Sequence, residues 1–586
     1  MQHHDSFAIT CQWLADHLLH QSEGQEIPST FQVQAIDAFI AVNRLPKARL
    51  ILLDGSPSTG DFAISNLSIF LPGNKVVIAA GYNSLNTDIF TGIVVKQGLE
   101  ITQTQQSQLI VELTDQAMAM TLERKNAVFS NSTDSALMTT LIQSNGLTAN
   151  VTATSIEYED IVQYYATDWD MLLMRAELNG FLALIAGGAI TVGAPDTSQT
   201  PVLSVVYGDS ILELHAELDA STQYKSSAIK SSAWDESTQQ VIESGPGSVS
   251  FNEQGNLTSD TLAATFNVTT YAQQTGAMLE SSSLQAWSSA ELLKSRLAKI
   301  RGTVKFQGSA LAQPGKMIQL GGLGNRFNGA AYISAVRQRI TDGQWMTTTT
   351  FGLAWPWFSS ETPDITAPGA SGQLPAINGL QTGKVKQVSA DPAGEFRVLI
   401  SLPLLGADAG NVWARLSTMY ASNQIGTVFY PEVDDEVIVS FMNNDPRYPV
   451  ILGAVYSKQL PPPYPPDQNN IKKAIVTRSK LEMTFDDQNK VVEIKTPGNR
   501  KVRLDDNAGT ITISDSNSNT VTLSSSGISL DSGSDISITA KQNITITAQA
   551  ALTMSANTKA SLKGTASGEL ISSGELTIRG AIVAIN

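Results

Sequence analysis

The sequence has little of what several classes of protein require. Its 586 residues include one cysteine, Cys11, and five histidines. No disulfide can therefore form within one chain, and a histidine-built metal centre is not indicated. Charged residues make up only 16% of the chain, against about 25% in an average domain. A formal net charge of −16 disfavours binding to nucleic acid or to an anionic membrane over the whole surface.

Long apolar runs are also missing. The longest, residues 181–194, contains three glycines and is shorter than the roughly 20 residues that span a bilayer. It therefore predicts buried strands. Residues 1–20 lack a basic segment followed by an apolar core, so we expect no signal peptide. We expect the chain to be synthesised in the cytoplasm.

Two loop-like stretches divide the chain. Residues 359–379 are rich in proline, glycine and serine, and residues 460–466 contain five prolines, a composition typical of a stiff spacer. We expect a region of strands and helices over 1–360, a linker over 361–378, a barrel over 379–458, a Pro-rich linker over 459–478 and a repetitive region over 479–586.

The first region combines both kinds of secondary structure. Apolar runs predict strands at 50–53, 75–80 and 90–95, and helical spacing of apolar residues predicts helices at 168–179 and 283–301. Asp168 is expected to cap the first of these helices, and Gly302 to end the second. The expected barrel has short runs at 395–400, 413–416 and 436–441, which fits a small OB-fold.

The last region lacks large side chains. No aromatic residue follows Phe485, and Pro497 is its only proline. Short apolar/polar alternations begin instead at residues 521, 528, 536, 544 and 552, in steps of seven and then eight, which is typical of a β-solenoid. The predicted inward side chains are Val521, Leu523, Ile528, Leu530, Ile536, Ile538, Ile544, Ile546, Leu552 and Met554.

Each of these strands offers only two or three aliphatic side chains, too few to offset the cost of ordering a single chain. Three chains wound about one axis would close the core and remove free strand edges. We therefore expect an intertwined trimeric β-helix, or β-prism needle. A single-chain β-helix is the alternative, although it usually has longer rungs.

The chain ends on apolar side chains without a charged tail. An uncovered end of this kind predicts a docking platform for another protein, and the alternative is a frayed end. The residues expected to form the platform are Ala581, Ile582, Val583, Ala584, Ile585 and Asn586.

No catalytic or cofactor motif is present. The segment from Gly55 to Gly60 lacks the lysine of a phosphate loop, His215 has no partnering nucleophile elbow, and the spacing of Cys11, His17 and His20 is not that of a metal site. The acid pairs Asp168/Asp170 and Asp434/Asp435 are expected to be structural. We therefore expect no enzyme activity, no metal and no cofactor.

Two adjacent segments carry a family resemblance. Residues 428–441 (VFYPEVDDEVIVSF) and 444–453 (NDPRYPVILG) resemble the signature of VgrG spike proteins of type VI secretion and related contractile injection systems. The chain departs from that signature at Asp434 and Asn444, where glycine is usual or common; both are turn positions that a left-handed residue can occupy. Residues 43–50, 90–94, 168–180, 324–333 and 483–487 are similar to further stretches of the family.

The resemblance implies a mainly β homotrimer: a hub of tandem barrels with helical insertions over 1–360, an OB-fold collar and the needle. It implies inner-tube and baseplate proteins as partners at the hub, a PAAR-type tip protein at the needle end, effectors as cargo, and no nucleic acid. The particle would be assembled in the cell, delivered outside or into a target cell on contraction, and contact a membrane only on firing. A β-helix-stalked cell-wall hydrolase and a receptor-binding tail fibre are the alternatives.

Overall fold

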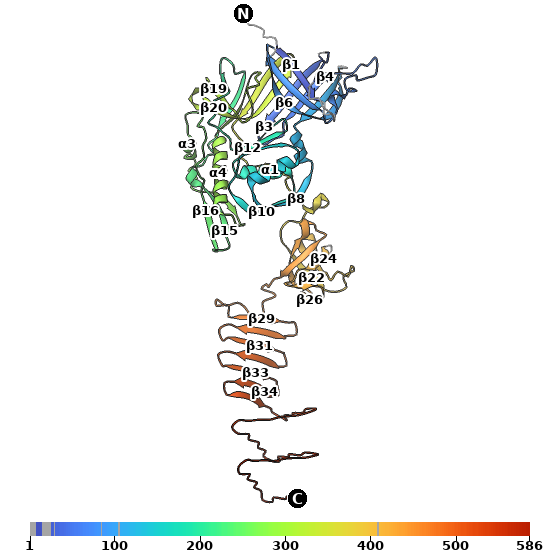
Figure 1. Cartoon of the computed structure of the whole chain (residues 1–586), viewed down its shortest axis with the longest axis vertical. Coiled ribbons are helices and arrows are strands. Elements are labelled where there is room, and N and C mark those ends of the chain that lie inside the picture. Colours follow the sequence, from blue (N-terminus) through green and yellow to red (C-terminus); the bar gives the residue numbers. More distant parts are fainter. Residues whose placement is uncertain are drawn as a thin grey trace. The chain divides into compact units, whose positions relative to one another are not determined.

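The computed structural model describes residues 7–14, 25–28, 30–83, 85–103, 106–406 and 410–585 (Figure 1). His3, His4, His17, His20, Asn586 and the side chain of Cys11 lie outside the described part. The chain forms two compact units: residues 1–378 with 443–446, and residues 379–442 with 447–586. Strands dominate and helices are few, which confirms the predicted fold class.

One large sheet organises the first unit. Its thirteen strands follow the order β14-β18-β21-β20-β3-β4-β7-β6-β5-β1-β2, with β19 joined to β20 and β13 to β19. Two separate apolar cores pack along it, one around Leu50 and Ile78 and the other around Val304 and Ile333, as expected for tandem barrels. The strands are β1 Phe7–Leu14, β2 Gln25–Glu26, β3 Val33–Ala41, β4 Lys47–Leu53, β5 Lys75–Tyr82, β6 Leu85–Ile101, β7 Ser107–Thr114, β13 Leu203–Val206, β14 Glu213–Leu218, β18 Ile300–Gln307, β19 Met317–Gly321, β20 Gly329–Thr341 and β21 Gln344–Phe351.

The three predicted strands of this region are confirmed as β4, β5 and β6. The longest apolar run forms the hairpin of β11 (Leu182–Ala186) and β12 (Ala189–Gly193), with Ile185, Ile190 and Val192 buried. The remaining strands form small separate sheets: β8 Arg124–Thr133, β9 Thr148–Val151, β10 Glu157–Thr167, β15 Ile229–Asp235, β16 Gln240–Ser244 and β17 Tyr271–Thr275.

Both predicted helices exist, with corrected ends. In α2 (Asp168–Leu178) the cap is Thr167, whose hydroxyl accepts a hydrogen bond from the Asp170 backbone N–H. Helix α4 (Ser281–Leu297) ends before Gly302. Gly302 lies in β18, where a Cβ would stand 2.1 Å from the His215 carbonyl oxygen. The other helices are α1 Asp134–Ser144, α3 Ser259–Ala263, α5 Gly324–Phe327 and α6 Phe358–Glu361.

The second unit begins with a closed five-stranded barrel, which confirms the OB-fold. Asp434 has a φ of 75° and Asn444 one of 57°, so both departures from the family signature fall on left-handed turn residues, as expected. The barrel strands are β22 Gln381–Gln387, β23 Val398–Ser401, β24 Asn411–Leu416, β27 Glu436–Phe441 and β28 Pro449–Ala454, with a small ribbon of β25 Ala421–Ser422 and β26 Ile425–Gly426.

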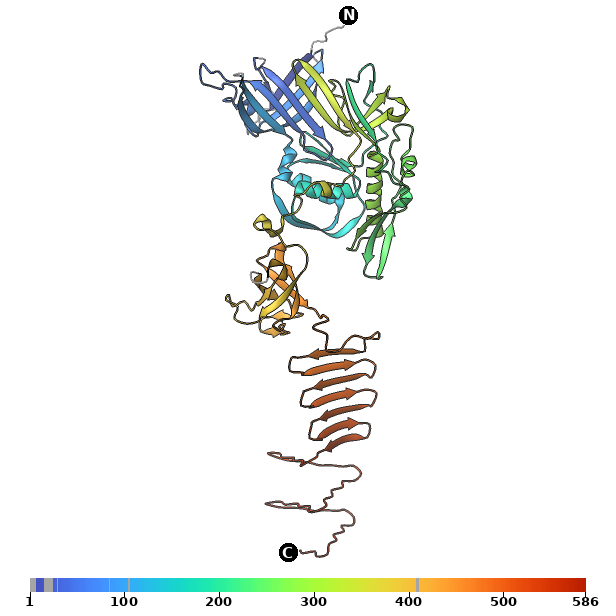
Figure 2. The same cartoon turned by 180° about the vertical axis from the view of Figure 1, so that it is seen from behind.

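The needle begins as a seven-stranded antiparallel sheet in which each strand pairs with the next along the chain. Figures 1 and 2 show these strands stacked, with the chain turning alternately at the two lateral edges. The sheet starts at Lys472, inside the predicted Pro-rich linker, and its strands fold back on one another where the repeat predicted solenoid rungs. The strands are β29 Lys472–Val476, β30 Glu482–Asp486, β31 Val491–Lys495, β32 Lys501–Asp505, β33 Thr510–Ser514, β34 Thr520–Ser524 and β35 Gly527–Asp531.

Turn chemistry explains the fold-back. The carboxylates of Asp486, Asp505 and Asp515 accept backbone N–H bonds from residues two to four positions ahead, at 2.8–3.0 Å. Such Asp-based turns reverse the chain, so the strands pair within one chain.

Residues 532–585, all of which the structure describes, form no strand. The chain instead bends at 533–534, 541–542, 549–550, 557–558, 565–566, 573–574 and 581–582. These bends recur every eight residues, so the period predicted from residues 528–552 continues to the end of the chain.

Candidate functional site: the apolar face of the needle

Two apolar columns run along one face of the needle sheet. Directly paired residues of antiparallel strands project to the same side, so the register places the columns without further assumption. The first column is Ile475, Met483, Ile494, Val502, Ile513, Val521 and Leu530. The second column is Phe485, Val492, Leu504, Ile511, Leu523 and Ile528. Together we call them the apolar face.

The apolar face is uncovered in a single chain. Ile494 is 51% exposed, Ile513 48% and Leu530 56%, and a groove of about 610 Å³ follows the first column. The opposite face is polar: Thr512 and Thr522 line it, and Arg503 there pairs with Asp505 at 2.8 Å and Glu493 at 3.4 Å. A continuous uncovered apolar surface marks a protein interface.

Four of the ten predicted core residues lie opposite one another in the strand ladder. Val521 pairs with Leu530, and Leu523 with Ile528. The other six, from Ile536 to Met554, lie in the extended segment and are exposed in the single chain. The alternation at 510–513, which lies in β33, is also apparent in the sequence, whereas the part of the apolar face in β29–β32 was not predicted, although the alternations in 491–495 and 501–505 carry the same signal.

Beyond the sheet, the eight-residue period defines two registers that continue the apolar pattern. The first register is Ile536, Ile544, Leu552, Ala560, Gly568, Leu576 and Ala584; the second is Ile538, Ile546, Met554, Leu562, Leu570, Ile578 and Asn586. Leucine, isoleucine and methionine therefore continue in the second register until its last position.

The chain end departs from these registers. Ile582, Val583 and Ile585 fall between the register positions, and Ile582 is 90% and Ile585 87% exposed. Ala581 and Ala584 are also exposed, while Asn586 lies outside the described residues. Ile582, Val583 and Ile585 thus present apolar side chains at positions that the two registers do not use.

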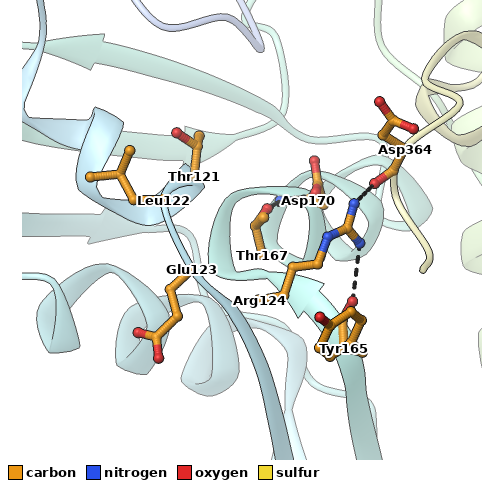
Figure 3. A pocket seen from close by; sticks show the side chains of 8 residues that line it. All are labelled: Thr121, Leu122, Glu123, Arg124, Tyr165, Thr167, Asp170 and Asp364. Atoms are coloured by element: carbon orange, nitrogen blue, oxygen red, sulfur yellow. Dashed lines mark hydrogen bonds between the residues drawn. The ribbon is translucent and has the colours of Figure 1, made fainter. Parts of the chain in front are cut away.

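A second feature is the segment that follows the last hub strand. Arg124 holds this segment in place. It lines a pocket together with Thr121, Asp170 and Asp364 (Figure 3). The guanidinium donates to the Tyr165 carbonyl at 3.1 Å, to the Ile365 carbonyl at 3.0 Å and to the Asp364 carbonyl. Arg124, which lines this pocket, therefore makes structural contacts to backbone carbonyls.

The same segment is held by a buried carboxylate. Trp357 Nε1 donates to Glu291 Oε2 at 2.6 Å, and Gln273 Nε2 donates to the same oxygen at 2.9 Å. Glu291 is fully buried. Burial raises the pKa of Glu291, and hydrogen bonds from Trp357 and Tyr271 and the charge of Lys294 offset this only in part.

The acid pairs weighed as catalytic candidates make structural contacts. Asp168 pairs with Lys125 at 2.6 Å and accepts from Gln163 and Asn145; burial works to raise the pKa of Asp168, but these bonds outweigh it and lower the pKa. Asp434 pairs with Lys384 at 2.8 Å, and Asp435 accepts the Glu432 backbone N–H at 2.9 Å.

The described residues contain no group of three or more His, Cys, Asp or Glu side chains placed to hold a metal ion. None of the helices among the same residues is long and apolar enough to cross a membrane.

Three families match the chain. The family described as "Alg8 N-terminal domain" matches residues 17–342, more than half of the chain. The "type VI secretion system/phage-baseplate injector OB domain" matches residues 381–456, which contain the barrel. The "phage baseplate V C-terminal trimerisation domain" matches residues 491–548, which contain most of the apolar face and the first extended repeats.

Individual relatives align over short stretches. The actin cross-linking toxin VgrG1 of Vibrio cholerae is 33% identical over 88 residues, 14% of this chain and 8% of the relative. The type VI secretion spike protein VgrG4b of Pseudomonas aeruginosa is 31% identical over 119 residues, 19% of this chain and 14% of the relative. The chain thus spans a small part of these relatives.

Among solved structures, a type VI secretion component of E. coli covers 73% of this chain and 98% of its own, at 12% identity and a TM-score of 0.37. A likeness of that size establishes no shared property. The family matches decide the assignment: the chain belongs to the Alg8 N-terminal domain family, and its injector OB domain and baseplate trimerisation domain make it a VgrG-type spike protein.

Proposed function

We propose that the chain is the central spike of a contractile injection apparatus, in which three copies bury their apolar faces against one another. The observation that carries this proposal is the pair of apolar columns that no part of the described chain covers. Three sheets five residues wide can surround one axis and bury both columns. The match of residues 491–548 to a trimerisation domain supports the same arrangement.

The extended segment supports a change along the needle, from a sheet formed within each chain to three chains wound around one another. Residues 532–585 make no strand pairs with any part of the chain that the structure describes, and backbone groups left unpaired in an extended segment are partners for another chain. The eight-residue bends would let three chains pair with one another in turn. The ten predicted core residues would then all face the trimer axis.

The proposed partners follow the parts of the chain. Inner-tube and baseplate proteins would meet the hub of the first unit, and effectors would travel with the spike. A conical tip protein of the PAAR type would seat on Ala581–Asn586, because the apolar side chains of the described part of this end are exposed.

The proposed role is mechanical. We infer that the chain carries no catalytic centre, because the candidate carboxylates serve turns and ion pairs. It would be assembled into the particle inside the producing cell and leave that cell on contraction. No observation favours the hydrolase or the tail fibre.

Particles purified from the producing organism test this function. An antibody to the first unit should label one end of each uncontracted particle, and quantitative mass spectrometry should find three copies per particle. Absence of the chain from intact particles would contradict the proposal.

The tip site has its own test. The double variant Ile582→Asp and Ile585→Asp should keep the trimer but lose the co-purifying tip protein, because charges replace the apolar contact. Thr577→Asp, which changes a polar position, is the matched control. Full retention of the tip protein by the double variant would place the platform elsewhere.

A further inference from the structure

The two lateral edges of the needle sheet differ in charge around β31 and β32. One edge holds the turns after β29 and β31, and the other holds the turns after β30 and β32. The first edge carries Arg478, Lys480, Lys495, Arg500 and Lys501; the second carries Asp486, Asp487, Asp505 and Asp506. The first edge also carries Glu482 and, at the turn after β33 and the end of β35, Asp515 and Asp531; the second edge also carries Lys472, Lys473 and Lys490.

Three cations of the first edge form a corner that one chain leaves unneutralised. Lys495 lies directly opposite Lys501 in the ladder, and Arg500 immediately precedes Lys501. Like charges directly opposite destabilise a sheet. None of the three makes an ion pair within the described residues. These three residues, which we call the basic corner, can therefore accept an anionic partner.

The second edge supplies carboxylates at neighbouring levels. Asp506 follows β32 directly, and Asp487 follows β30. Asp487 has Lys473 as its partner, Asp486 is 4.0 Å from Lys472, and Asp505 pairs with Arg503. Asp506 is exposed and makes no ion pair within the described residues.

We propose that the basic corner of one chain packs against the acidic edge of the next copy, head to tail, so that charge fixes how three copies close. The inference rests on the trimeric spike proposed above. When the apolar faces point to one axis, the lateral edges meet at three corners. A head-to-tail ring repeats one heterologous contact, whereas a copy turned end for end would bring like edges together.

Charge reversals in the full-length chain test the proposal. The basic-corner variant carries Arg500→Glu and Lys501→Glu, and the acidic-edge variant carries Asp487→Arg and Asp506→Arg. In low salt each of these two variants should raise the chain concentration at which half of the trimer dissociates by about tenfold or more. The reason is that repulsion between like charges replaces the attraction of exposed ion pairs at every corner. The fourfold variant restores opposite charges and should recover the trimer, and high salt should narrow all differences.

The outcomes separate this inference from the trimer itself. A wild-type chain that is monomeric overturns both. A trimeric wild type whose two reversals leave the midpoint unchanged overturns the charge-matched closure alone, and so does a fourfold variant no better than either reversal. Circular dichroism of each variant at high salt checks that the needle sheet still forms, and Lys563→Glu in the extended segment is the control for a general charge effect.

Discussion

At the residue scale, single positions show why the chain departs from its family's signature. Asp434 replaces a glycine yet keeps the left-handed conformation, with a φ of 75°. An aspartate tolerates that conformation better than most residues, and its carboxylate reaches Lys384 at 2.8 Å. The substitution therefore exchanges backbone freedom for an exposed ion pair.

This exchange predicts a difference between two substitutions. Asp434→Ala should destabilise the barrel, because alanine is strained at this φ and the exposed ion pair is lost. Asp434→Gly should change stability little, because the relaxed backbone offsets the lost pair. Hydrogen exchange of β27 in the full chain measures both, and equal effects of the two substitutions would show that the φ does not decide.

The buried Glu291 predicts a pH dependence. Its pKa is raised above the ordinary 4.5, so the folded chain holds the proton more tightly than the unfolded chain does. The stabilisation is complete below pH 4.5 and is lost as the pH rises through the folded pKa. Glu291→Gln cannot titrate, so its thermal midpoint relative to wild type should increase as the pH rises through this window.

The control for this comparison is Glu236→Gln, which changes an exposed carboxylate and should show no such trend. A difference between Glu291→Gln and wild type that stays constant with pH would contradict the account.

Residue patterns predicted the left-handed turns and the structural role of Asp168. They missed Thr167 as the cap of α2 and the burial of Glu291. Thr167 and Asp168 are both good cap residues, and only the pairing of Asp168 with Lys125 from β8 assigns their roles. Glu291 is buried by Trp357 and Gln273, which are distant in sequence.

At the element scale, the needle shows what a sequence period can and cannot predict. The alternation correctly predicted two apolar side chains per strand and the eight-residue step. It did not predict that 472–531 folds back as an antiparallel sheet, because an alternating strand looks the same whether its partner is the next strand or another chain. The Asp-based turns after Asp486, Asp505 and Asp515 were the missing signal.

The two faces of this sheet predict opposite responses to the same chemical change. Ile513→Asp places a carboxylate on the apolar face, where assembly would bury it three times near one axis, so it should prevent trimer formation. Thr512→Asp lies one residue away on the polar face and should leave assembly intact. Analytical ultracentrifugation of both variants decides, and equal behaviour would mean that the apolar face is not the interface.

At the scale of the whole molecule, the hub, the barrel and the needle differ in whether a single chain can complete them. Two apolar cores pack along one thirteen-stranded sheet, and the closed barrel leaves no free edge of its own. The needle is the part that a single chain cannot complete, since its apolar face stays open and its last segment has no strand partner among the described residues. We therefore expect the folded needle to exist only in the trimer.

The mass of the purified full-length chain in solution tests that claim most directly. Sedimentation equilibrium over a wide range of concentrations should give three times the 62.6 kDa of one chain, and hydrogen exchange on the same sample should show protected amides from β29 to the end of the repeats. A stable 62.6 kDa monomer with an equally protected needle would contradict the account.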